Sequence, residues 1–199
     1  MMRNLLAGLV RLASGVRLLP SVPHGDGPAI YFANHASHMD FVVVWAALPD
    51  KVRELTCPAA AEDYWGETAL RRWIACELFR AILIPRRDVS RQNHPVDRLG
   101  VALESGRSVI IFPEGTRATT DETGDFKSGL YHLARRYPDI PLVPVYLENL
   151  SRILPKGSRL PVPLIAQARF LIPLRFEPGE SKQIFLARAR AALVEEIRH

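Results

Sequence analysis

Two short polar clusters hold the residue types that acid–base chemistry and anion binding require. The first, NHASHMD over residues 34–40, follows the apolar run 29–33 and contains an amide, two imidazoles, a hydroxyl and a carboxylate. The second, FPEGTR over residues 112–117, follows the run SVII and adds threonine and arginine donors that suit phosphate oxygens. In α/β sheets ligands bind where strands end and helices begin, so such clusters are the first candidates for a site.

The first cluster predicts a general base. His35 and Asp40 are five residues apart, which on a continuous helix separates them by about 140°. A helix would not pair them, whereas a strand end that turns into a helix can, with His35 on the turn and Asp40 in the first helical turn. A carboxylate on one ring nitrogen fixes the tautomer and leaves the other nitrogen free to accept a proton.

Three alternatives stay open for this cluster. A metal site would use His35, His38 and Asp40, but no further strong ligand stands nearby, so no metal is expected. A nucleophilic Ser37 would need an enclosing turn of the GxSxG type, which is absent, and Ser37 is expected to cap the following helix. A polar turn that only satisfies backbone groups is the third alternative.

The elements around both clusters indicate an α/β fold. Short apolar runs alternate with helical patterns, which predicts a single domain with a mixed, mostly parallel sheet covered by helices. The expected strands are 29–33, 81–84, 108–112, 141–147 and 168–176, the expected helices are 41–48, 69–79, 96–105, 128–137 and 186–198, and the expected loop is 151–163. The helix at 41–48 is expected in the core behind His35.

Composition narrows the partners. The 199-residue chain carries a net charge of +5, which favours an anionic partner. Its arginine pairs lack interleaved aromatic residues, so nucleic acid is not expected. Cys57 and Cys76 fit neither a disulfide framework nor a zinc pattern and suggest a reducing, cytoplasmic setting.

The first 19 residues form an amphipathic pattern. One arc of a helix would hold the apolar residues Met1, Met2, Leu5, Leu6, Leu9, Leu12, Val16 and Leu19, and the other arc would hold Arg3, Asn4, Arg11 and Ser14. No run reaches the roughly 20 apolar residues of a membrane span, and no signal peptide is expected. Such a helix either lies in a membrane interface, with its arginines on anionic head groups, or packs on its own domain.

Together the clusters resemble the glycerolipid acyltransferase family, whose familiar members are 1-acylglycerol-3-phosphate acyltransferases. Asn34, His35 and Asp40 match the NHxxxxD motif, and residues 112–117 match FPEGTR without a substitution. Looser blocks are 80–86, where Arg80 replaces a usual glycine, 126–129 and 140–145. The resemblance runs from about residue 24 to 175.

The resemblance implies roles for these residues. His35 would be the base that deprotonates the acceptor hydroxyl, and Asp40 would orient it. The acceptor would be held by Asn34, Arg86, Glu114, Gly115, Thr116 and Arg117, with Arg117 on its phosphate, and Lys127 is a weaker candidate.

It also implies a function. We expect an O-acyltransferase that moves a fatty acyl group from acyl-CoA or acyl carrier protein to lysophosphatidate, without cofactor or metal. Other acceptors are glycerol 3-phosphate, lyso-ornithine lipid or another lysolipid, and other classes are a thioester hydrolase and a non-catalytic lipid-binding module. The expected organisation is a membrane-interface helix at 1–19 and an acyltransferase domain at 20–199, attached peripherally to the cytoplasmic face of an anionic membrane.

Overall fold

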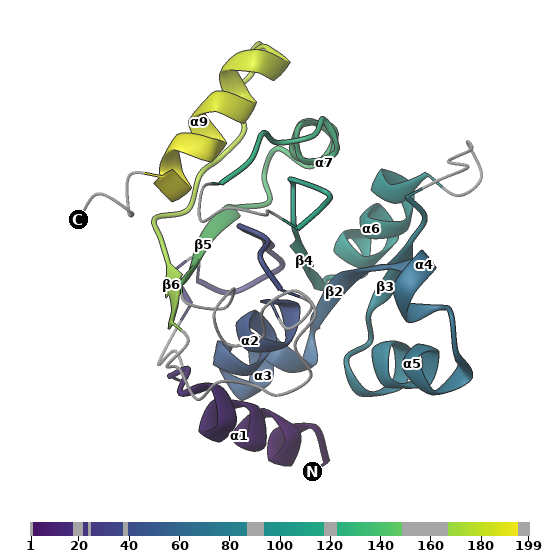
Figure 1. Cartoon of the computed structure of the whole chain (residues 1–199). Coiled ribbons are helices and arrows are strands. Elements are labelled where there is room, and N and C mark those ends of the chain that lie inside the picture. Colours follow the sequence, from purple (N-terminus) through teal and green to yellow (C-terminus); the bar gives the residue numbers. More distant parts are fainter. Residues whose placement is uncertain are drawn as a thin grey trace.

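The computed structural model describes residues 2–17, 22–23, 25–37, 40–86, 94–117, 123–148 and 167–194 (Figure 1). The helices are α1 (Met2–Ser14), α2 (Asp40–Ala47), α3 (Asp50–Glu54), α4 (Glu62–Trp65), α5 (Ala69–Trp73), the π-helix η1 (Ile74–Leu78), α6 (Pro95–Glu104), α7 (Gly129–Arg136) and α9 (Lys182–Val194). The strands are β1 (Ile30–Ala33), β2 (Thr56–Ala61), β3 (Ile82–Ile84), β4 (Ser108–Ile111), β5 (Leu142–Glu148) and β6 (Gln167–Phe170). The predicted loop at 151–163 lies outside the described residues.

These strands form one sheet in the order β3-β2-β4-β1-β5-β6. The first five strands pair in parallel, and β6 runs antiparallel to β5 at the edge. The prediction of a mixed, mostly parallel sheet covered by helices is therefore confirmed. In this order β1 and β4 are neighbours, so the two polar clusters that follow them leave the sheet side by side.

Both faces of the central strand β1 are buried, as is usual in parallel sheets. Ile30 and Phe32 of β1 pack with α6, α7 and α9, whereas Tyr31 and Ala33 pack with α2 on the opposite face. Figure 1 shows α1 on the outer side of α2, away from α7 and α9. Helix α2 is therefore enclosed by the sheet and α1, and all eight of its residues are buried, which confirms the predicted core helix.

Helix α1 packs on its own domain. Its polar side chains face α2 and α3, where Arg11 Nη1 donates to Ala46 O at 3.1 Å and Arg3 Nη2 donates to Arg53 O at 3.4 Å. The buried Arg53 in turn donates from Nη2 to Asn4 Oδ1 at 2.9 Å. Of the two alternatives for this helix, packing on its own domain is observed for Arg3 and Arg11, and contact with a membrane stays a prediction. The two arginines donate to carbonyl groups in the last turns of α2 and α3.

Four large apolar side chains of α1 face outward instead, whereas Leu6 and Val10 pack against the core. The most exposed are Met2 (60%), Leu5 (66%), Leu9 (54%) and Leu12 (83%). None of the helices in the described part of the chain is long and apolar enough to span a membrane. The proposed boundary between residues 19 and 20 lies outside the described residues.

Two strand predictions were wrong. Strand β2, with the sequence TCPAAA, was not predicted, because alanine has little strand preference and proline removes a ladder donor. Pro58 is tolerated where pairing changes over, since residues 56–58 pair with β4 and residues 59–61 pair with β3. The strand expected at 168–176 stops at Phe170, shortly before Pro173.

One backbone position in the block at residues 80–86 is strained. Arg80, which replaces the glycine that the resemblance implies there, has φ +53° in the left-handed region. Arg80 thus keeps the chain path that a glycine would adopt with less strain. Burial of the Arg3 side chain and the positive charge of the nearby Arg80 both lower the pKa of Arg3.

Candidate active site

His35 and Asp40 form the pair that the sequence predicted. Strand β1 ends at Ala33 and α2 begins at Asp40, so the histidine lies on the turn and the carboxylate lies in the first helical turn. Asp40 Oδ2 lies 2.7 Å from His35 Nδ1 and also accepts the backbone N–H groups of Ala36 (2.6 Å) and Ser37 (2.8 Å). The predicted positions of both residues are confirmed.

This geometry fixes the tautomer of His35. Asp40 is fully buried and accepts two backbone amides, so Nδ1 carries the proton that it donates to Oδ2. Nε2 then has a free lone pair, and the imidazole keeps 20% of its side chain exposed. The ring stacks on Phe112 with centroids 4.4 Å apart, which fixes its plane. The arrangement is that of a buried carboxylate orienting a general base.

Asn34 links this turn to the sheet. Its Nδ2 donates to Leu147 O at 2.9 Å, and its Oδ1 accepts from Leu147 N at 2.8 Å. The side chain thereby extends the pairing of β1 with β5 beyond Ala33. Asn34 was predicted as a substrate-binding residue, and the structure places its amide on the strand backbone.

Glu114 occupies a comparable position in the second turn. Its carboxylate is buried, and Oε1 accepts from His35 N at 2.9 Å while Oε2 accepts from Gly124 N at 3.1 Å. The resemblance assigned Glu114 to the acceptor. In the structure its two oxygens instead hold the turn that carries His35 against the segment that begins at residue 123.

Gly115 has two reasons to be glycine. Its φ is +70°, a conformation that other residues rarely adopt, and a Cβ there would lie 2.8 Å from Lys127 Nζ. Lys127 is anchored by its own N–H, which donates to Pro113 O at 2.8 Å. The bare glycine therefore gives the lysine side chain room to cross the FPEGTR turn and reach the cavity.

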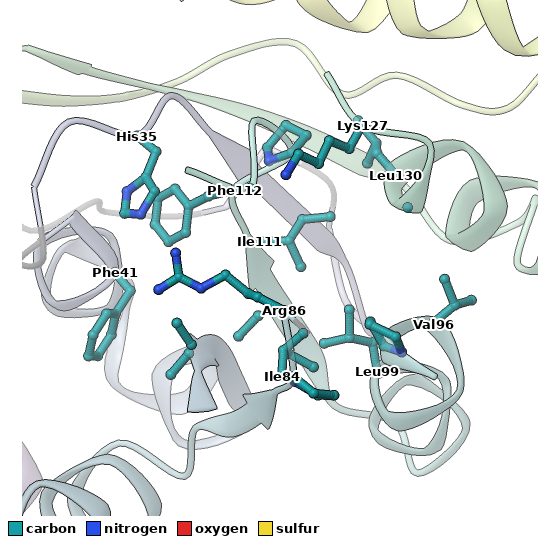
Figure 2. Close-up of a pocket in the computed structure, with 18 of the residues that line it drawn as sticks. His35, Phe41, Ile84, Arg86, Val96, Leu99, Ile111, Phe112, Lys127 and Leu130 are labelled. Atoms are coloured by element: carbon teal, nitrogen blue, oxygen red, sulfur yellow. The ribbon is translucent and has the colours of Figure 1, made fainter. Parts of the chain in front are cut away.

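A cavity of about 330 Å³ lies beside His35 (Figure 2). Three cationic side chains line it: Arg86, Arg117 and Lys127. Arg86 Nε donates to Asp63 Oδ1 at 3.1 Å, whereas no carboxylate among the described residues pairs with Arg117 or Lys127. Thr116 is exposed and does not line the cavity. Two unpaired cations next to a base suit an anionic group on the molecule that the base attacks.

The rest of the cavity is apolar. Figure 2 shows Arg86 extending toward His35 and Phe112, with aliphatic side chains beyond it. The aliphatic ones come from β2, β3, β4, α6 and α7 and include Ala59, Ile84, Leu99, Ile111 and Leu130, and α4 adds the aromatic Trp65. The cavity therefore combines a base, cations and an apolar wall, as an amphiphilic ligand requires.

Sequence reasoning missed parts of this site. The wall formed by β2 was missed together with the strand, and Lys127 was ranked below Arg117 although both are unpaired. Among the described residues no group of three histidine, cysteine or acidic side chains that could hold a metal was found. His38 lies outside the described residues.

Fold and site together define a class: an α/β protein with a histidine–carboxylate pair beside a cationic, partly apolar cavity at the carboxyl edge of a parallel sheet. A family model described as Acyltransferase matches residues 14–148, well over half of the chain. The chain therefore belongs to the acyltransferase family.

Individual relatives agree. The chain is 27% identical over 145 residues to the chloroplastic 1-acyl-sn-glycerol-3-phosphate acyltransferase BAT2 of Brassica napus, covering 70% of this chain and 38% of that protein. It is 29% identical over 174 residues to the 1-acyl-sn-glycerol-3-phosphate acyltransferase of Limnanthes douglasii, covering 86% and 59%. The chain thus spans less than two thirds of either relative.

A solved structure shares the fold. The crystal structure of the 1-acyl-sn-glycerophosphate (LPA) acyltransferase PlsC from Thermotoga maritima superposes with a TM-score of 0.75 at 16% identity, covering 99% of this chain and 78% of that one. At this identity the likeness supports the fold.

Proposed function

We propose that this protein transfers a fatty acyl group from a thioester to the free hydroxyl of 1-acylglycerol 3-phosphate and so produces phosphatidate. The observation that carries the proposal is the free Nε2 of His35 on the wall of a cavity that also holds Arg117 and Lys127. The base would activate the hydroxyl while the cations hold the phosphate of the same molecule. Relatives whose names describe this acceptor give further support.

The proposed reaction needs one base. His35 Nε2 takes the hydroxyl proton as the oxygen attacks the thioester carbonyl, and Asp40 stabilises the imidazolium that forms. The tetrahedral intermediate collapses by breaking the carbon–sulfur bond, which yields the ester and a thiolate. The thiolate leaves readily because a thiol has a pKa near ~8.5, and it can then take the proton from His35. No acyl-enzyme intermediate, cofactor or metal enters this scheme.

The phosphate would bind to the two cavity cations that have no carboxylate partner among the described residues, Arg117 and Lys127. Arg117 offers a planar fork of donors that matches two phosphate oxygens, and Lys127 adds a compact charge next to Gly115. Arg86 is shared with Asp63 and would contribute less. An acyl chain would lie against the aliphatic wall, and the donor is either acyl-CoA or acyl carrier protein.

We further propose that the protein attaches peripherally to the cytoplasmic face of a membrane through α1. The stripe of Met2, Leu5, Leu9 and Leu12 is exposed, and burying such side chains in the acyl boundary is favourable. Because Arg3 and Arg11 donate to the domain, the contact depends on apolar side chains, and much of it should survive raised salt.

Point variants on the exposed stripe test this attachment better than deletion of residues 1–19, which would uncover α2. Leu5→Ser with Leu9→Ser should release the protein from sedimented vesicles that contain anionic lipid. Leu6→Ser, on the partly buried side, is the matched control for loss of hydrophobicity within the same helix. Unchanged sedimentation of the double variant would contradict the attachment.

The acceptor is tested by offering labelled acyl-CoA and acyl carrier protein to the purified protein with a panel of acceptors. The panel contains lysophosphatidate, glycerol 3-phosphate, lyso-ornithine lipid and a monoacylglycerol that lacks phosphate. We expect lysophosphatidate to be preferred and Arg117→Ala to remove that preference. Equal use of the monoacylglycerol by the wild-type protein would contradict the phosphate assignment.

A further inference from the structure

Helix α9 reaches the segment beside the active site through one arginine. Arg190 Nη2 donates to Thr123 O at 2.6 Å, and its Nε lies 3.2 Å from both Thr123 O and Gly124 O. Helix α9 itself is anchored by Phe185, Ala189 and Leu193, which are buried against the core that contains α7 and β5. A rigid helix thus holds a guanidinium on two carbonyls of residues 123 and 124.

The peptide group between Thr123 and Gly124 also contacts, through Glu114, the turn that carries His35. The carbonyl of Thr123 and the N–H of Gly124 belong to one peptide group, whose oxygen faces Arg190 and whose N–H donates to Glu114 Oε2 at 3.1 Å. The other oxygen of Glu114 accepts from His35 N at 2.9 Å. A positive charge on a carbonyl polarises the peptide and strengthens the bond that its N–H makes.

The approach of these groups is close. A Cβ on Gly124 would lie 3.0 Å from Glu114 Oε2, so the glycine lets the carboxylate contact the backbone. Glu114 is buried, and burying a carboxylate is costly unless its oxygens are hydrogen-bonded. Arg190 supplies charge through the peptide, and the two N–H groups supply hydrogen bonds.

We propose that Arg190 is a positioning residue for His35 and that it acts through the 123–124 peptide and Glu114. This proposal rests on the proposed function, in which His35 is the base. Helix α9 lies beyond residues 14–148, so the family match does not assign this contact. The C-terminal helix then fixes the backbone of the catalytic turn, while Asp40 fixes the ring.

The test compares two arginines of the same helix. Arg188 donates to Glu180 at 2.7 and 2.9 Å and to Arg175 O at 2.9 Å. In the described part of the chain it makes no hydrogen bond to residues 123–124. Its hydrogen bond lowers the pKa of Glu180, so Arg188→Gln removes a real ion pair of α9. The Arg188→Gln variant therefore shows how a weakened attachment of α9 affects activity when the contact with residues 123–124 is kept.

For Arg190→Gln we expect kcat to fall by about tenfold while KM for the acceptor changes little, because the base is displaced and the phosphate site is kept. Arg188→Gln should leave kcat near the wild-type value. Arg190→Lys, which keeps the charge, should recover part of the loss. In Glu114→Gln, the further change Arg190→Gln should cost little, because the path is already broken.

Two readouts do not depend on activity. Amide hydrogen exchange at residues 34–37 and 123–126 should be faster in Arg190→Gln than in Arg188→Gln, and the ¹⁵N signals of the His35 ring should shift only in the former. If the wild-type protein transfers no acyl group, the proposed function fails, and these two readouts still judge the positioning. Unchanged exchange and ring signals in Arg190→Gln, or equal changes in Arg188→Gln, would overturn the proposal.

Discussion

The turn after β1 and the turn after β4 leave adjacent strands and contact each other, yet their polar side chains have different tasks. In the first turn Asn34 and Asp40 bond to backbone groups and to His35, so only the far side of the imidazole faces the cavity. In the second turn Glu114 faces inward in the same way, whereas Arg117 faces the cavity unpaired.

This difference separates two groups of residues. Asn34, Asp40 and Glu114 hold the turns in place, whereas His35, Arg117 and Lys127 face the cavity and would contact the ligand. Both turns contain buried carboxylates that accept backbone N–H groups, Asp40 through Oδ2 and Glu114 through both oxygens, and these carboxylates hold the turns in place. Among the described residues that line the cavity, Nε2 of His35, Arg117 and Lys127 are left for a ligand. Substitution of the residues that hold the turns should lower stability or kcat, and substitution of the cations should weaken acceptor binding.

The largest effect is expected for His35→Ala, which removes the imidazole whose free Nε2 lies on the cavity wall. The rate of acyl transfer should fall by about three orders of magnitude because the hydroxyl loses its base. Circular dichroism and the unfolding midpoint should stay near those of the wild type. Retention of a tenth of the rate or more would remove His35 from the mechanism.

A smaller loss of activity is expected for Asp40→Asn. This variant tests whether a residue that holds the turn in place also affects the rate of acyl transfer. The neutral amide cannot stabilise the imidazolium, so kcat should fall by about a hundredfold. It also accepts the backbone amides less well, which should cost about 1–3 kcal/mol in urea unfolding. An unchanged kcat with lowered stability would limit Asp40 to a structural role.

Arg117→Ala should show the opposite signature. Loss of a charged hydrogen bond of about 1.5–3 kcal/mol should raise KM for lysophosphatidate by roughly tenfold or more, with kcat nearly kept. Stability should not change, since the side chain is exposed and has no ion-pair partner among the described residues. If Arg117→Ala lowers kcat and leaves KM unaltered, the distinction between residues that hold the turns and residues that bind the acceptor is wrong.

Asn34→Ala should act mainly on stability. Removing both bonds to Leu147 leaves a strand end with unpaired groups, at a cost of about 1–3 kcal/mol. We expect a lower urea midpoint with a kcat reduced only severalfold. A large rise in KM instead would return Asn34 to the ligand-binding residues that the resemblance implied.

The smallest effect is expected for Arg80→Gly, in the motif block that lies outside both turns. Glycine relieves the left-handed strain at φ +53°, although it also frees the unfolded chain, so stability should rise by at most about 1 kcal/mol. Activity should not change, because Arg80 does not line the cavity. A lower unfolding midpoint would show that its bond to Glu54 O outweighs the strain.

The sequence predicted the parts of the site that are local. His35 and Asp40 are five residues apart, and only a strand-to-helix turn can pair them, so their spacing was informative. The alternating apolar runs likewise predicted four of the six strands closely, because buried parallel strands are apolar throughout.

The partners of Glu114 were not predictable in this way. The carboxylate meets His35 N across 79 residues, and the residue type does not reveal whether it faces a cation or two amides. The orientation of α1 was similarly hidden. Periodicity defines two faces of a helix but not which of them faces the domain. The polar face of α1 turns inward because Arg3 and Arg11 donate to carbonyl groups of α3 and α2.

The most direct test of the central claim counts both products in one reaction. Purified protein is given acyl-CoA or acyl carrier protein thioester with lysophosphatidate, and the thiol released and the phosphatidate formed are measured together, with and without the acceptor. The mechanism predicts one phosphatidate for each thiol and negligible thiol release without the acceptor. Thiol release that does not need the acceptor would indicate a hydrolase, and no turnover of either thioester with lysophosphatidate present would contradict the acyl-transfer assignment.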